Sequence, residues 1–174
     1  MKVNERPRSS GTRIEEPKNP ETAVAMGRAL VAEAEKGATR TARHAQRIEA
    51  ARRFRTAIRM NGSFEEAYGW LAYALRMIGQ DLRESNAGAA DDFLRLACAV
   101  AWEAKTKTQA AALSGRTRQE AKVLIAWIRA TRHLSVDEAE AEMESLRARH
   151  LAEALDAEAI VGVAPDPGTG PTAE

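Results

Sequence analysis

The chain has 174 residues, of which 44% are hydrophobic and 5% aromatic, and its formal net charge is +1. No run of 18 apolar residues occurs and the first 18 residues lack an apolar stretch, so we expect neither a membrane span nor a secretory signal peptide. The single cysteine, Cys98, excludes a disulfide framework within the chain and favours a cytoplasmic protein.

The first part of the chain predicts a polar segment followed by two helices. Residues 1–19 are polar and contain two prolines, so we expect them to be disordered. Asn19 is placed to cap a helix whose first residue is Pro20, where the missing N–H costs nothing. This helix is predicted to end at Lys36, before Gly37, and a second helix to cover 38–60.

A tight turn is predicted after the second helix. Gly62 can leave a helix in a left-handed conformation without steric cost. Ser63 and Glu66 have the spacing of a capping box, so a third helix is predicted over 64–78. Around this turn Phe54, Tyr68 and Trp70 are expected to fill the space between the two helices.

Three further helices complete the prediction. A fourth is expected over 86–113 with a break near 106–109, and Cys98 lies in its apolar stretch. Two more possible capping boxes open the last helices: Thr117 with Glu120, and Ser135 with Glu138. The sixth helix is predicted to reach about Ala159, and the tail 161–174, rich in proline and glycine, to be mobile. Long β-branched alternations are absent, so the prediction is an all-α domain over 20–160 with about six helices.

The region around the turn resembles a tetratricopeptide repeat (TPR). The matching positions are small or large apolar residues at helical spacing, followed by an inter-helix glycine: Ala50, Phe54, Ala57, Tyr68, Leu71, Ala72, Leu75 and Gly79. The match is clear over 50–79; Gly62 replaces the usual proline, and Glu84 stands where the family has a small residue. The resemblance implies a short solenoid of antiparallel helical hairpins, with a related α-α bundle as the alternative.

The resemblance also implies where a ligand binds, on the side of the third helix that faces away from its partner helix. The positions that line a TPR groove are here Glu66, Gly69, Tyr73, Arg76 and Met77. Arg76 offers a fork for a carboxylate and Gly69 offers room for a peptide backbone. The Lys and Asn of the family's carboxylate clamp are absent, since Gly69 and Tyr73 hold those places. The alternative is that Tyr73 and Met77 pack against a neighbouring helix.

Arginines follow two stripes of the second helix. The first stripe is Arg40, Arg43 and Arg47, and the second is Arg52, Arg55 and Arg59. They can form a solvated face, neutralised in part by the acidic helix that begins near Asp137, or a surface for nucleic acid or phosphate. An acidic protein partner is the third possibility.

The sequence nominates no catalytic residue, metal site or cofactor. The histidines lie far apart, and no glycine-rich phosphate loop or calcium-binding loop is present. We therefore predict a non-enzymatic adaptor, scaffold or assembly factor that binds another protein or peptide. Nucleic-acid binding and a structural subunit of a homo-oligomer are the alternatives; Trp102 and Trp127 are boundary core residues or interface anchors. The chain has 20 arginines and six lysines, and such a preference for arginine is typical of a GC-rich bacterium.

Overall fold

A computed structural model describes residues 15–37, 39–107 and 113–156, and every regular element in these ranges is an α-helix. The helices are α1 (Pro20–Lys36), α2 (Arg40–Met60), α3 (Glu65–Leu82), α4 (Ala87–Lys107), α5 (Gly115–Arg132) and α6 (Val136–Leu155). The prediction of an all-α bundle of about six helices is confirmed. The tail 161–174 and most of the predicted N-terminal segment 1–19 lie outside the described residues, as does the expected end of α6 near Ala159.

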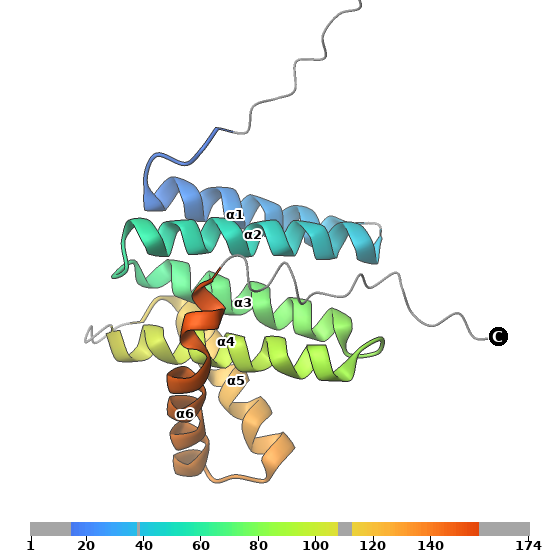
Figure 1. Ribbon diagram of the computed structural model, residues 1–174, viewed down its shortest axis with the longest axis vertical. Coiled ribbons are helices and arrows are strands. Elements are labelled where there is room, and N and C mark those ends of the chain that lie inside the picture. Colours follow the sequence, from blue (N-terminus) through green and yellow to red (C-terminus); the bar gives the residue numbers. More distant parts are fainter. Residues whose placement is uncertain (1–14, 38, 108–112, 157–174) are drawn as a thin grey trace, which may run out of the picture.

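The first four helices lie side by side, and the last two cross them (Figure 1). Helix α1 packs on α2, α2 on α3, and α3 on α4, so each neighbour in sequence is also a neighbour in space. Helices α5 and α6 run steeply across this direction, and α6 packs on α4 more extensively than on its own hairpin partner α5. The third hairpin therefore departs from the regular stacking of the first two.

Short polar side chains set the starts of most helices. Asn19 accepts a hydrogen bond from the Thr22 N–H (2.7 Å) with Pro20 as the first helical residue, as predicted, while Thr39 caps α2. At α6 the side chain of Ser135 and that of Glu138 form the predicted capping box. These caps satisfy N–H groups that have no partner inside the helix.

Two of the three predicted capping boxes are wrong. The N-cap of α3 is Phe64, which has no capping side chain, so Ser63 lies one residue too early; the Ser63 N–H is donated to the Asn61 side chain at 3.0 Å. The N-cap of α5 is Ser114 rather than Thr117, which lies buried inside the helix. Gly62 is not left-handed either: among the described residues only His133, which ends α5, has a positive φ. Helix α3 also continues to Leu82, four residues beyond its predicted end.

Glycines allow three pairs of helices to approach closely. A Cβ at Gly27 of α1 would lie 2.5 Å from the Phe54 ring of α2, and one at Gly79 of α3 would lie 2.9 Å from the Ala90 carbonyl of α4. At Gly69 of α3 a Cβ would lie 2.3 Å from Thr117 Oγ1 and 2.9 Å from its backbone nitrogen. The last contact presses the start of α5 against α3 and shapes the surface described below.

The C-terminal part of α6 reaches back to the first hairpin. Arg55 of α2, with 1% of its surface exposed, donates from Nε to the Ala154 carbonyl at 2.8 Å. Near the middle of α6, Glu144 accepts a hydrogen bond from the indole N–H of Trp102 of α4 at 2.8 Å. Helix α6 therefore ties α2 and α4 together.

Candidate functional site: the hollow beside Trp70

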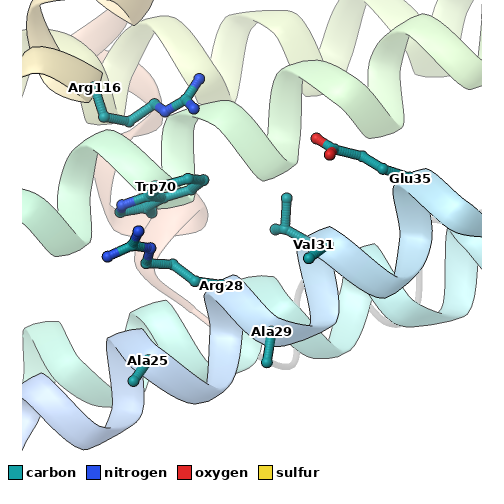
Figure 2. Close-up of a pocket in the computed structure, with 8 residues that line it drawn as sticks. Ala25, Arg28, Ala29, Val31, Glu35, Trp70 and Arg116 are labelled. Atoms are coloured by element: carbon teal, nitrogen blue, oxygen red, sulfur yellow. The ribbon is translucent and has the colours of Figure 1, made fainter.

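Helix α1, the first half of α3 and the start of α5 line an open hollow of about 440 Å³, which we call the Trp70 hollow (Figure 2). Its lining residues come from three helices: Ala25, Arg28, Ala29, Val31, Ala32, Glu35, Trp70 and Arg116. Three of the α1 residues, Ala25, Ala29 and Ala32, are exposed, so this wall is smooth and accessible from solvent.

Two arginines flank the half-buried indole of Trp70. The guanidinium carbon of Arg28 lies 5.1 Å from the centre of the indole and that of Arg116 lies 4.4 Å from it. Figure 2 shows one guanidinium on each side of the ring, reaching it from α1 and from the start of α5. Arg116 also lies 4.6 Å from the Tyr73 ring, so both arginines are held by cation–π contact. The hollow thus has a rigid aromatic wall between two positive charges.

Neither of these arginines is fully neutralised by its acidic neighbour. Glu120, completely buried, already accepts hydrogen bonds from Nε and Nη2 of Arg76 at 2.6 and 2.9 Å, and it lies 3.7 Å from Arg116. The pKa of Arg76 is raised, chiefly by its hydrogen bond to Glu120. The Glu120 carboxylate therefore interacts mainly with Arg76 and less with Arg116. Arg28 faces Glu66 at 3.6 Å in a solvent-exposed pair, and such pairs are weak. Both guanidiniums can therefore bind an anionic group of a ligand.

The far end of the hollow is acidic. Glu35, near the end of α1, accepts a hydrogen bond from the Tyr73 hydroxyl at 2.9 Å, and this bond holds the carboxylate on the hollow side. The pKa of Tyr73 is raised, first by burial and then by the hydrogen bond to Glu35. The tyrosine therefore stays a neutral donor at physiological pH.

A second, smaller hollow of about 270 Å³ adjoins the first on the α5 side. The two hollows share Arg28, Trp70 and Arg116; the second is completed by Glu66, Ser114, Gly115 and Gln119. The two hollows therefore meet at Trp70 and its two arginines and form one continuous surface.

The predicted groove residues are spread over several environments. Glu66 lines the second hollow and Tyr73 supports the first, whereas Arg76 is bound to Glu120. Met77 is half-buried and packs against the core. The prediction that Gly69 leaves room for a peptide backbone is wrong, because Thr117 of α5 fills that space.

The predicted basic surface is narrower than expected. Arg47 is 5% exposed and ion-pairs with Asp81 of α3, and Arg55 is buried against α6, so neither belongs to a surface. Of the remaining four, Arg40 and Arg52 face Glu84 and Glu49, respectively, at 3.4 and 3.3 Å. Arg43 is half-buried, and Arg59 is exposed and bonds to Thr56.

The prediction that Trp70 fills the space between α2 and α3 is confirmed for one half of its side chain; the other half forms a wall of the hollow, which the sequence did not indicate. Trp70 stacks on Phe54 with ring centres 6.1 Å apart, which accounts for its buried half. Trp70 follows the predicted groove residue Gly69 in the sequence, and this position could have indicated that it lies at the site. Of the other two tryptophans, Trp102 is buried and Trp127 is half-buried against the core.

Within the described ranges, no group of three or more His, Cys, Asp or Glu side chains is placed to hold a metal ion. In the same part of the chain, no helix is both long and apolar enough to span a membrane.

Comparison of the chain with protein-family models, with curated proteins and with solved structures found no match. The TPR resemblance therefore stays a prediction, and the hollow itself is the basis for a proposed function.

Proposed function

We propose that this chain is a non-enzymatic interaction module that binds a segment of another protein in the Trp70 hollow. The observation that carries the proposal is the placement of Trp70 between Arg28 and Arg116, which come from helices far apart in the sequence. Tryptophan, tyrosine and arginine are enriched among the few residues that carry most of the binding energy of a protein interface. An adaptor, scaffold or assembly role follows from such binding.

The chemistry of the hollow favours a peptide segment over a small metabolite. The volume of about 440 Å³ can hold several side chains, and its α1 wall is exposed along its length. The two guanidiniums offer forked N–H donors for a carboxylate, and the indole offers a flat apolar contact. A segment with an acidic residue beside an apolar one fits both features.

A peptide selection tests this proposal. A random peptide library is selected on the wild-type chain, and the dissociation constants of the binders are measured by fluorescence anisotropy. We expect Trp70→Ala to weaken binding by about tenfold or more, as for an interface anchor. Arg116→Gln, which keeps a polar side chain of similar length, should weaken the same peptides. Circular dichroism establishes that both variants remain folded.

Arg52→Ala is the matched control, because Arg52 is an exposed arginine that does not line the hollow. Its affinities should equal those of the wild type. The proposal would be refuted if the dissociation constants of the selected peptides were unchanged by both Trp70→Ala and Arg116→Gln. Salt-sensitive binding of nucleic acid that is lost in Arg52→Ala with Arg59→Ala would favour the alternative of a basic surface.

A further inference from the structure

Helix α1 carries two opposite charges on the side that faces the Trp70 hollow. Arg28 and Glu35 both line the hollow, and they are seven residues apart in one helix. Seven residues are close to two complete turns, so the two side chains share a face about 10 Å apart along the axis. Figure 2 shows the guanidinium of Arg28 at one end of the hollow and the carboxylate of Glu35 at the other.

Neighbouring helices reinforce this separation of charge. At the Arg28 end, Arg116 adds a second cation across the Trp70 ring, while the buried Glu120 nearby is bound by Arg76. At the other end, the Tyr73 hydroxyl fixes the Glu35 carboxylate. The Trp70 end carries two guanidiniums against one exposed carboxylate, Glu66, so it is cationic. The Glu35 end is anionic, and Val31 lies between the two ends.

We propose that the segment bound in the hollow is an α-helix with an acidic and a basic side chain seven residues apart on one face. This inference rests on the proposed function of the Trp70 hollow. The acidic side chain pairs with Arg28 beside the Trp70 ring, and the basic side chain pairs with Glu35. Ala29 and Ala32, which lie between the two charges on α1, leave space for a second helix to lie alongside.

An extended segment fits this charge pattern poorly. A strand rises about 3.3 Å per residue, so it covers the distance between Arg28 and Glu35 in about three residues. Residues three apart in a strand point to opposite faces, so they cannot both reach α1. A helix places residues seven apart on one face at the required distance. The spacing of the charges thus selects a helical partner.

Synthetic peptides provide the test. We would compare alanine-rich helical peptides of about 20 residues, long enough to be helical in isolation. One pair carries Glu and Lys seven residues apart, in either order, with a leucine midway. The matched control peptides have the same composition with a spacing of about nine residues, which places the two charges on opposite faces. Binding to isotope-labelled protein is followed by amide chemical shifts, which detect weak affinities.

We expect one of the seven-spaced peptides to bind about tenfold tighter than the nine-spaced peptides and to shift amides of α1 and α3. Glu35→Lys should weaken the binding of this peptide. The variant should instead prefer a further peptide with Glu at both of the seven-spaced positions. Glu33→Lys is the matched control, because Glu33 is exposed on the same helix but does not line the hollow; it should leave the preference unchanged.

Equal affinity for both spacings, or no binding of any designed peptide, overturns the inference. The proposed function would still stand if the peptides selected from the random library lose affinity in Trp70→Ala without any charge spacing. If neither the designed nor the selected peptides depend on Trp70, both the inference and the proposed function fail.

Discussion

At the scale of single residues, charged side chains take part in the interior of this bundle. Arg55 is 1% exposed, and burial lowers its pKa to about 10. Its Nε donates to Ala154, whereas its Nη2 atom has no hydrogen-bond partner within the described residues. The lowered pKa means that burial disfavours the charged form, so the charge of Arg55 opposes folding at neutral pH.

We expect Arg55→Met and Arg55→Ala to differ strongly in stability. Met keeps most of the volume and removes the buried charge, so the free energy of unfolding should stay within about 1 kcal/mol of the wild type. Ala leaves a cavity between α2 and α6 and should cost about 2–5 kcal/mol. Urea unfolding followed by circular dichroism measures both values. Equal losses in the two variants would show that the charge itself stabilises the fold.

This arginine also shows what the sequence could not predict. The stripe of Arg52, Arg55 and Arg59 is regular, and a regular stripe is typical of a solvated face. Arg55 is buried because α6, about 100 residues later in the chain, crosses this face. The spacing of charges along one helix contains no information about which distant helix covers it.

At the scale of helices, local signals predicted the elements well. The start of α1 at Pro20 and its end at Lys36 are as predicted, because Asn19 and Gly37 act over single turns. The candidate site was predicted only in part: Glu66 lines the second hollow and Tyr73 bonds to the lining residue Glu35. Arg28, Glu35 and Arg116 reach the site through the packing of α1 and α5 on α3. Packing between helices decides the site, and no local pattern encodes it.

The contact between α3 and α5 supplies the prediction at this scale. Gly69→Ala should destabilise the fold by about 1–3 kcal/mol, because the new methyl group would overlap the backbone and hydroxyl of Thr117. Since that backbone belongs to α5, the strain should also move Arg116 and weaken peptide binding in the Trp70 hollow. Thermal unfolding and the binding assay above measure the two effects.

Gly88→Ala is the control for Gly69→Ala. Gly88 is an exposed glycine in the first turn of α4, and its nearest neighbour would be 3.6 Å from the new methyl group. It should leave stability unchanged or raise it by up to about 1 kcal/mol through helix propensity. Equal stability of the two variants would mean that α5 moves away from α3 without cost.

At the scale of the whole molecule, the position of α6 couples the two ends of the bundle. In a regular solenoid each repeat contacts only its neighbours, so distant repeats can unfold separately. Here α6 packs on α4 and also bonds to α2 through Arg55. We therefore expect the described helices to unfold as one cooperative unit.

Cys98 is a natural probe of this cooperativity, since it is the only cysteine of the chain and is completely buried in α4. Burial raises the pKa of its thiol, so the reactive thiolate is scarce in the folded state. In a urea series, the extent of labelling by a thiol reagent should follow the loss of helical circular dichroism with one midpoint. Labelling that precedes the loss of helix would reveal separate unfolding of α5 and α6.

The crossing of α6 over α4 also bears on how this chain could change in length. Repeat proteins grow when a repeat is duplicated, because the last hairpin offers the same stacking surface as every other hairpin. In this molecule α6 covers the side of α4 on which it packs and its far end is bonded to α2, so a duplicated hairpin inserted after α4 would have to displace it. The bundle is therefore closed to growth by repeat duplication directly after α4.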